Sequence, residues 1–411
     1  MPYESLIVGL DIGTSKVCAV VGELNEHGIL DIIGVGAGKS RGMRRGVVVN
    51  IEATLKSVAE AIEAAEMMSG REVQSVITGI GGARIEGINS RGVVAVSGRN
   101  REISHDDIRR VIDAAKAIVI PMDREVLHVL PQEFIVDDQR GIKDPLDMIG
   151  VRLEAEVHII TGSISSAENL MKCVNRAGFR VQQIVLQSLA SSGAVLSEDE
   201  KDLGVLLVDL GGGTTDVLMH VEGAPYHTDV IAIGGSQVTS DLSIMLKTPV
   251  DAAEKIKKDA GCCFLPLVEG DEEVIIPGVG GWPAASIPRK EMCRIIQPRM
   301  TEIFSMVREQ LEKKGLLRHL GGGVVLTGGG SLLPGTSELA QEVFGVPARI
   351  GFPKKMGGLT KEFQSPLYSA AVGLVCFGAE IEQAVHQTIG VAKKTGEGIL
   401  NRLRGWMREF F

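Results

Sequence analysis

The chain has 411 residues, of which 44% are hydrophobic and only 4% aromatic, and its 43 basic and 52 acidic side chains give a net charge of −9. This length exceeds what one compact core supports, so we expect two lobes or more. An acidic chain with few aromatic side chains is poorly suited to nucleic acid, because it repels polyanions and offers bases few stacking partners. These numbers exclude an ordinary DNA- or RNA-binding protein.

The cysteines and the hydropathy restrict the cellular compartment and the kind of membrane contact that we expect. The six cysteines form no Cys-x-x-Cys pair, so we expect reduced thiols in a cytoplasm. The first residues lack the positive charge of a signal peptide and lead directly into a strand-like segment. No segment reaches the roughly 18–20 apolar residues of a membrane span. Any membrane contact is therefore expected to be peripheral.

The chain opens with a compact α/β unit. Strands are expected at 6–10, 16–21 and 30–35, a helix at 51–68 and a buried strand at 73–78. The same order returns later, with strands at 204–209, 217–221 and 228–233 and a helix at 236–246. Such a repeat predicts two similar lobes rather than a solenoid.

Matching residues support this duplication. Asp11 and Asp209 lie 198 positions apart, as do Gly13 and Gly211. We then expect two extra residues in the second copy. Thr14 would accordingly match Thr214, and Val17 would match Val217.

Two segments interrupt the repeat. Residues 84–161 predict an inserted αβ module with strands at 85–96, 126–136 and 151–160 and a helix at 107–119, preceded by a Ser104–Asp107 capping box. The second interruption, at 248–314, predicts helices at 250–259 and 290–313 and a hairpin around 274–276. Thr248 and Pro249 are expected to cap and begin the first of these helices.

The resulting division of the chain has nine parts. They are the first lobe (1–83), the inserted subdomain (84–161), the first lobe again (162–196), the second lobe (197–247), its small subdomain (248–314), the second lobe again (315–362), a return to the first lobe (363–389), a linker (390–397) and a C-terminal helix (398–411).

Three glycine turns follow strands, at 11–16, 209–216 and 327–331. Glycine allows backbone N–H groups to converge on a phosphate, and nearby hydroxyls add donors. Asp11 and Asp209 are expected to face each other and to suit Mg²⁺, which keeps several waters and takes few protein ligands. The third turn, after a strand at 324–326, is expected to open a helix and to pack against a nucleoside. Any single turn could be merely structural, but three in this order are more specific.

These turns carry a resemblance to a known superfamily. The motifs LDIGTSKV, VDLGGGTTDV and VLTGGGSLLPG resemble the phosphate and adenosine turns of actin, heat-shock chaperones and sugar kinases. Within that superfamily, NSRGVVAVSGRNREIS, PQEFIVDDQRGIKDPLDMIGVRLE and AAVGLVCFG resemble the FtsA family of bacterial cell-division proteins, over essentially the whole chain. The resemblance implies an α/β fold with two duplicated ribonuclease-H-like lobes of the actin type, a nucleotide cleft between them, an inserted αβ subdomain and a C-terminal amphipathic helix.

The resemblance also implies ATP and Mg²⁺ as cofactors. Asp11 and Asp209 would hold Mg²⁺ through water, while Glu254 and Lys257 would approach the ribose and adenine, although a solvated helix face is the alternative for these two. The remaining expected nucleotide contacts are Gly13, Thr14, Ser15, Lys16, Gly211, Gly212, Gly213, Thr214, Thr215, Gly328, Gly329 and Gly330.

Hydrolysis requires a group that positions water in line with the γ-phosphate. Gln187 and Ser188 stand where such a group is needed, just before a helix expected at 189–196. No histidine or glutamate stands out as a general base. We therefore expect at most slow hydrolysis, with the nucleotide state controlling lobe closure and assembly.

The last residues predict an amphipathic helix that lies in a membrane surface. Its apolar side chains fall within an arc of about 140° flanked by arginines, as interfacial helices require. Lys393 and Lys394 would add about 1 kcal/mol each of attraction to anionic lipid. A helix docked on its own protein is the alternative, which a polar linker and terminal aromatic residues disfavour. The expected membrane contacts are Ile399, Leu400, Arg402, Leu403, Arg404, Trp406, Met407, Arg408, Phe410 and Phe411.

A basic segment at 290–314 is a candidate partner surface. Alone, such a segment is more often a solvated helix face. FtsA-like proteins use this part of the second lobe to bind the C-terminal peptide of the tubulin-like division protein FtsZ, which makes Arg294 and Arg299 the candidate contacts.

The resemblance thus implies an ATP-binding cell-division protein. It would polymerise on the cytoplasmic side of the inner membrane at the division septum, tether the FtsZ ring there and help to recruit later division proteins. A sugar or acetate kinase would need a catalytic aspartate at an acceptor pocket, and a chaperone ATPase would need a further substrate-binding domain. An actin-like pilus-assembly ATPase shares the fold, but the membrane-seeking tail speaks against it.

Overall fold

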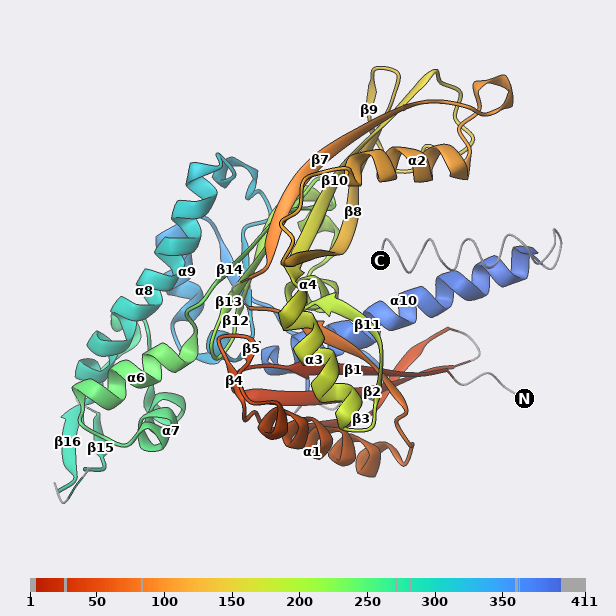
Figure 1. Ribbon diagram of the computed structural model, residues 1–411. Coiled ribbons are helices and arrows are strands. Elements are labelled where there is room, and N and C mark those ends of the chain that lie inside the picture. The colour runs from red at the N-terminus through yellow and green to blue at the C-terminus, as the bar shows by residue number, and fades with distance from the viewer. Residues whose placement is uncertain are drawn as a thin grey trace.

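The computed structural model describes residues 5–392, apart from 26, 27, 83, 271, 279, 281, 282, 359, 360 and 362. Two lobes are each built around a five-stranded mixed sheet, and a four-stranded subdomain projects from the first of them (Figure 1). The two-lobe α/β architecture expected from the sequence is confirmed.

The sheet of the first lobe has the order β11-β6-β1-β2-β3. β1 pairs antiparallel with β2 and parallel with β6. The strands are β1 (Ser5–Ile12), β2 (Lys16–Leu24), β3 (Leu30–Lys39), β6 (Ser75–Ile80) and β11 (Arg180–Leu186). Two further short strands, β4 (Met43–Arg44) and β5 (Val47–Val48), pair antiparallel with each other.

Alternating side chains of this sheet supply two separate cores. One face packs on α1 (Ile51–Ser69) and α3 (Ile164–Arg176), and the other on α4 (Gln187–Val195) and α10 (Ser369–Ala392). The second core also takes in Leu207 of the other lobe, so α4 links the two sheets.

The second lobe repeats the first. Its sheet order is β14-β13-β12-β17-β18, and these strands correspond in turn to β3, β2, β1, β6 and β11 of the first lobe. This correspondence confirms the duplication. The strands are β12 (Val205–Leu210), β13 (Thr215–Val221), β14 (Ala224–Ile231), β17 (Val324–Thr327) and β18 (Ala348–Ile350). The helices are α5 (Glu198–Leu203), α6 (Gly235–Met245), α7 (Val250–Ala260), α8 (Arg289–Lys313) and α9 (Thr336–Phe344), and the expected hairpin is β15 (Glu273–Ile276) with β16 (Ala285–Pro288).

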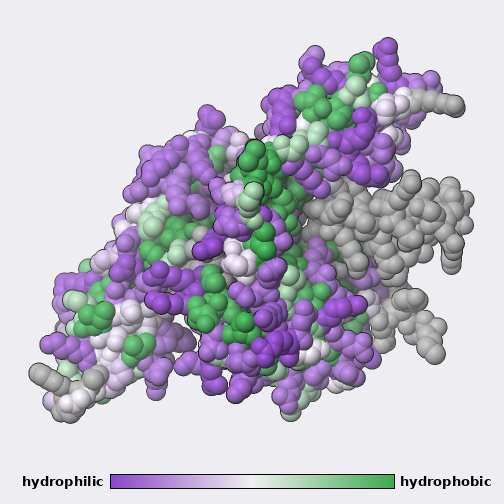
Figure 2. All heavy atoms as spheres, viewed as in Figure 1, coloured by the Kyte–Doolittle hydropathy of each residue, from purple (hydrophilic) through white to green (hydrophobic). Residues whose placement is uncertain are grey.

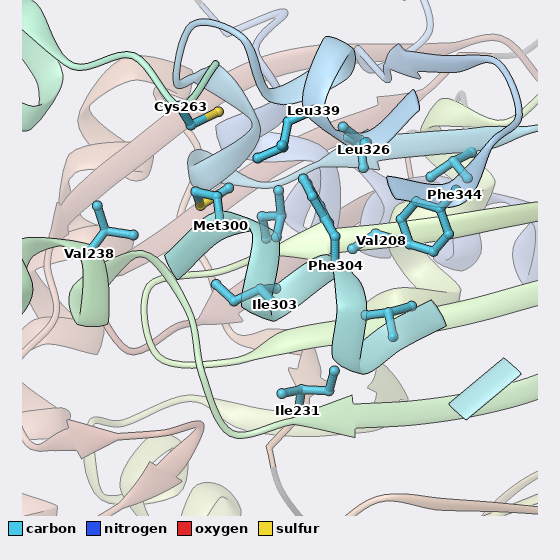
Figure 3. Packing of buried hydrophobic residues seen from close by; sticks show 14 of the residues in the cluster. Val208, Ile231, Val238, Cys263, Met300, Ile303, Phe304, Leu326, Leu339 and Phe344 are labelled. Atoms are coloured by element: carbon cyan, nitrogen blue, oxygen red, sulfur yellow. The ribbon is translucent and has the colours of Figure 1, made fainter. Parts of the chain in front are cut away.

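The core of this lobe lies between the sheet and α8. Phe304 of α8 is fully buried and meets Phe344 of α9 edge to face, with 6.0 Å between the ring centroids (Figure 3). Leu326 of β17 and Leu339 of α9 belong to the same cluster. Because α8 packs along this core, its exposed side carries the basic segment noted in the sequence.

The inserted subdomain is a sheet of order β7-β10-β8-β9 with α2 (His105–Lys116) packed on it. Its strands are β7 (Glu86–Ala95), β8 (Arg124–Val136), β9 (Gln139–Ile142) and β10 (Arg152–Ser163). The capping box is confirmed, because Ser104 Oγ accepts from the Asp107 amide while the Asp107 carboxylate accepts from the Ser104 amide. β9 was not expected, since four residues after a turn carry almost no periodic signal.

Three local predictions need correction. Thr248 does not cap α7, because its hydroxyl donates to the carbonyl of Pro277 at 2.7 Å and Pro249 takes the N-cap position. The third glycine turn opens a short 3-10 helix (Gly329–Leu332) rather than an α-helix, since Pro334 and a left-handed Gly335 delay α9 until Thr336.

The boundary expected at residue 389 also moves. α10 continues to Ala392, because one glycine costs a helix only about 1 kcal/mol and does not by itself end it. Lys393, Lys394 and the predicted membrane helix at 398–411 lie outside the described residues.

The described helices include none that is long and apolar enough to cross a bilayer. The visible face is largely hydrophilic, with hydrophobic residues gathered in a band near the centre, where the inserted sheet meets the body (Figure 2).

Candidate nucleotide site

Two equivalent hairpins carry the first two glycine turns. In the first, the amide of Gly13 donates to the carbonyl of Lys16 at 2.9 Å, and in the second the amide of Gly211 donates to the carbonyl of Thr214 at 2.9 Å. The two turns therefore have the same length.

This equality corrects the residue matching expected from the sequence. The prediction of two extra residues, which matched Thr14 to Thr214 and Val17 to Val217, is wrong. Lys16 instead occupies the place of Thr214. Shared residue types suggested the earlier matching, whereas the hydrogen-bond register of each hairpin decides which residues are equivalent.

The two turns approach each other closely. A Cβ on Gly212 would overlap Ser15 Oγ, and a Cβ on Gly213 would lie 2.6 Å from Thr14 Oγ1. Within the described part of the chain, the backbone N–H groups of these four residues have no hydrogen-bond acceptor. Unused amides gathered between two strand ends are the donors that a phosphate requires.

The predicted carboxylates lie at the ends of β1 and β12, and α4 orients both. Gln187 Nε2 donates to Asp11 Oδ1 at 2.6 Å, while Ser191 Oγ donates to Asp209 Oδ2 at 2.8 Å. Gln187 and Ser191 are four residues apart and so lie on one face of the helix. A single helix thus fixes one carboxylate from each lobe.

A third carboxylate, missed from the sequence, joins them. Asp216 stands opposite Asp209 in the β12–β13 register, and its Oδ1 is buried with no partner among the described residues. The sequence offered a signal, because Asp216 is the last residue of the second glycine motif. The wrong matching made Asp216 equivalent to Lys16. The strand register instead makes it equivalent to Cys18, which stands opposite Asp11 in the first lobe.

Burial makes these acids hard to ionise. It raises the pKa of Asp11, with Lys16 opposing the shift. It also raises the pKa of Asp209 to about 6, to which the charge of Asp11 contributes, and that of Asp216 to about 7, with the charge of Asp209 adding to the effect. A cation near these carboxylates would relieve their repulsion. The described residues contain no cluster of three or more His, Cys, Asp or Glu side chains that could hold a metal directly.

Two predicted phosphate ligands have partners within the protein. The Lys16 ammonium donates to the carbonyl of Leu367 and lies 4.3 Å from the ring centroid of Tyr368. The Thr215 hydroxyl donates to the carbonyl of Ile233 at 2.8 Å. Each side chain thus bonds its glycine turn to a neighbouring backbone segment.

The third turn lies against the second. Gly328 has a φ of +77°, and a Cβ there would overlap Asp209 Oδ1. A Cβ on Gly330 would lie 2.9 Å from the Cβ of Leu210, whereas one on Gly329 would meet only Leu367, at 3.5 Å. The structure therefore brings all three turns together beside Asp209.

Glu254 and Lys257 lie on α7 and face the start of α6. Lys257 Nζ is 2.7 Å from the Glu254 carboxylate and donates to the carbonyl of Gly235 at 3.0 Å. Burial opposes ionisation of Glu254, but bonds from Lys257 and Thr239 lower its pKa overall. These contacts place the pair next to the second turn, because the Gly235 amide donates to the Gly211 carbonyl.

The candidate water-positioning residues begin α4. Besides its bond to Asp11, Gln187 packs its side chain against Gly81, where a Cβ would overlap Oε1. Ser188 Oγ is buried and has no partner among the residues described.

The candidate partner arginines lie elsewhere, on α8. Arg294 pairs with Glu291, one turn before it. Arg299 donates to both oxygens of Asp241, at 2.7 and 3.1 Å, and also pairs with Glu302. Arg299 is therefore largely committed to internal contacts, and Arg294 is the more available of the two.

Similarity to known proteins agrees with this geometry. The family described as "Cell division protein FtsA" matches residues 206–373, and the "SHS2 domain inserted in FTSA" matches residues 82–161. The cell division protein FtsA of Borreliella burgdorferi is 51% identical over 99% of this chain and 100% of its own length.

Solved structures share the fold at low identity. The PilM-PilN type IV pilus biogenesis complex has a TM-score of 0.65 at 16% identity, covering 91% of this chain and 98% of the other. MreB 5 of Spiroplasma citri bound to AMPPNP has a TM-score of 0.57 at 15% identity, covering 93% and 98%. At identities of 15–16% these solved structures show only that the architecture is shared. The 51% identity to the Borreliella burgdorferi protein over nearly the whole chain, together with the two family matches, decides the family: this chain, an actin-like protein of cell division, belongs to the FtsA family.

Proposed function

We propose that this chain binds ATP with Mg²⁺ between its two lobes. The observation that supports this most strongly is the facing pair of turns, where four backbone amides lack acceptors beside carboxylates from both lobes. The amides would bind phosphate oxygens, and Asp11 and Asp209 would hold Mg²⁺ through water. The ion would neutralise charge on the phosphates.

In this proposal the third turn and α7 enclose the nucleoside. Gly328 and Gly330 allow the chain to pass close to Asp209, and Glu254 with Lys257 lies beside the second turn. Gln187 donates to Asp11, and this bond would hold the side chain where it orients a water. We expect slow hydrolysis, below the roughly 1 s⁻¹ of ordinary enzymes.

Replacing Asp209 by Asn tests the site. The amide keeps the shape and the bond from Ser191 but removes the charge that would face Mg²⁺. We expect the affinity for Mg-ATP, measured with a fluorescent ATP analogue, to fall about tenfold or more, because bonds to charged groups are worth about 1.5–3 kcal/mol. Asp113→Asn, on the exposed face of α2, is the matched control. Equal affinity in the two variants would contradict the proposal.

We also propose that the chain assembles on the cytoplasmic side of the inner membrane at the division septum and there tethers FtsZ and recruits later division proteins. The membership in the FtsA family and the basic, apolar-faced tail sequence support this. Self-assembly would strengthen a weak anchor, because many linked copies bind a surface far more firmly than one.

The FtsZ C-terminal peptide would contact the small subdomain of the second lobe through α8. Arg294→Glu reverses an exposed charge whose one partner among the described residues is Glu291, so we expect binding of the FtsZ C-terminal peptide to weaken several-fold. Arg299→Glu is less clean, because it also breaks the pair with Asp241. Fluorescence anisotropy with a labelled peptide measures the effect, and Arg308→Glu on the same helix is the control. Unchanged binding in the Arg294 variant would remove this residue from the interface.

A further inference from the structure

The inserted subdomain is bonded to the second lobe, although in the sequence it interrupts the first. β14 is an edge strand of the second-lobe sheet, and β7, β8 and β10 of the inserted sheet lie against it (Figure 1). We call this contact the seam. On the other side, β10 runs directly into α3 of the first lobe, and the amide of Leu186 donates to His128 Nε2 at 3.0 Å. The subdomain therefore bridges the two lobes.

A buried hydrogen bond lies within the seam. His158 Nε2 of β10 is 2.9 Å from Thr228 Oγ1 of β14, and both side chains are buried. Because Asn89 Oδ1 can only accept, His158 Nδ1 donates to it and Nε2 accepts from the Thr228 hydroxyl. The packing leaves no space beside this bond, since a Cβ on Gly87 would lie 2.7 Å from His158 Nε2 and 3.1 Å from Thr228 Cβ. The two sheets are thus in direct contact.

Two donors at the rim of the seam bond to the backbone of the second lobe. Gln132 Nε2 of β8 donates to the carbonyl of Pro225 at 3.0 Å. Lys143 Nζ, just after β9, donates to the carbonyl of Glu222 at 2.6 Å. Both acceptors belong to the β13–β14 hairpin. Because they are backbone atoms, these bonds hold the hairpin itself rather than a rotatable side chain.

A hydrophobic cluster connects the seam to α4. Val230 of β14 packs in it with Leu186 and Leu189, beside buried side chains of the inserted sheet. These two leucines flank Gln187, the first residue of α4, which donates to Asp11. A displacement of the inserted sheet relative to β14 would therefore reach the helix that orients a carboxylate from each lobe.

We propose that the inserted subdomain is a brace that fixes the angle between the two lobes and thereby slows the release of a nucleotide from between them. Both lobes hold the subdomain, so a lobe that turns away from the other must break the seam or distort the subdomain. Opening of such a cleft commonly limits how fast a ligand leaves. The part of this inference that concerns release rests on the proposed nucleotide site, whereas the brace itself does not.

Two kinds of variant loosen the seam. Lys143→Met with Gln132→Met removes both rim donors and keeps unbranched side chains of similar length. Arg140→Met with Gln139→Met makes the same chemical changes on β9 and is the matched control, because Arg140 pairs with carboxylates of the inserted sheet itself. Gly87→Ala acts inside the seam, where the added methyl group would overlap the His158 ring.

The angle between the lobes is measured first, in the full chain without nucleotide. Double electron–electron resonance gives the distance between nitroxides at Glu60→Cys on α1 and Glu342→Cys on α9, both exposed positions. We expect a broader or displaced distance distribution in the rim variant and in Gly87→Ala, and the wild-type distribution in the control. Unchanged distributions in both seam variants would overturn the brace, as would an equal change in the control.

Release of a fluorescent ATP analogue, chased with excess ATP in a stopped-flow instrument, tests the consequence. We expect release at least about threefold faster from both seam variants than from the control, as the loss of an ordinary hydrogen bond predicts. Release at the wild-type rate from variants whose lobes have loosened would overturn the link to the nucleotide. A wild-type chain that does not bind the analogue would contradict the proposed function instead, and the nitroxide distances would still decide the brace.

Discussion

At the scale of single residues, burial decides the protonation of several side chains. Asp209 and Asp216 have pKa values raised to about 6 and 7, whereas burial lowers the pKa of His128 to about 4 and that of His158 to about 3. In each case the low-dielectric surroundings disfavour the charged form. A cation at the candidate nucleotide site would therefore relieve the repulsion between these carboxylates, and the buried histidines are kept neutral.

His158 gives a prediction about acid stability. Its ring joins two subdomains, with Nδ1 near Asn89 Oδ1 and Nε2 2.9 Å from Thr228 Oγ1. The unfolded chain binds a proton at about pH 6.5 but the folded chain only near pH 3, so stability is present above pH 6.5 and is lost as the pH falls towards 3. The charges of His227, Lys314 and His220 reinforce this shift.

Replacing His158 by Gln should reduce this acid sensitivity. We expect the loss of unfolding free energy between pH 7.5 and 5.5, measured by urea unfolding, to shrink by about 1.4 kcal/mol. His105→Gln, on the exposed start of α2, is the control and should leave the loss unchanged. An unchanged pH dependence in the His158 variant would show that this histidine does not contribute.

At the scale of elements, close contacts between glycines and helices position the first lobe. Gly36 of β3 lies directly beneath α1, where a Cβ would overlap the carbonyl of Ala61. Gly38 lies two residues further along the same strand, and a Cβ added there would meet no atom within 4 Å. Both residues point to the same side of the sheet, because side chains alternate along a strand.

This pair of glycines gives a matched prediction. Gly36→Ala must push α1 away from the sheet, and we expect it to lower the free energy of unfolding by about 1–3 kcal/mol. Gly38→Ala should change it by no more than about 0.5 kcal/mol. Thermal unfolding of both variants measures the difference. Similar melting temperatures for the two would mean that α1 tolerates the displacement.

At the scale of the whole molecule, the proposed membrane attachment depends on the terminal sequence. A helix of thirteen residues from Ile399 to Phe411 would be short, and Gly405 costs it about 1 kcal/mol of helicity relative to Ala. One copy should therefore bind lipid reversibly, and assembled copies should bind firmly.

Liposome sedimentation tests the anchor. Deleting residues 399–411 should leave a protein that binds ATP but stays in the supernatant. Trp406→Glu, on the expected apolar arc, should weaken sedimentation strongly, whereas Asn401→Glu adds the same charge to the opposite side and should have little effect. Sedimentation of the deletion variant with vesicles would show that another part of the chain binds the membrane.

Much of the fold followed from local signals. Hydrophobic periodicity located the strands around the first two glycine turns and the helices α1, α2, α6, α7 and α8, whereas α3, β11, α9 and α10 were not placed. The repeated Asp11 and Asp209 motifs revealed the two lobes, because each strand–turn–strand unit carries its own pattern. β9 and the N-cap of α7 escaped, since four residues carry little periodicity and the Thr248 side chain bonds to a distant carbonyl instead of a nearby amide.

The sequence alone determined the duplicated lobes, the three glycine turns and the resemblance to a family of division proteins. Only the tertiary structure decided that Asp216 joins the two predicted carboxylates, that Lys16 takes the place of Thr214, and that Arg299 is held by Asp241. Hydrogen-bond register and burial are properties of chain segments brought together from distant positions. No local pattern in the sequence specifies them.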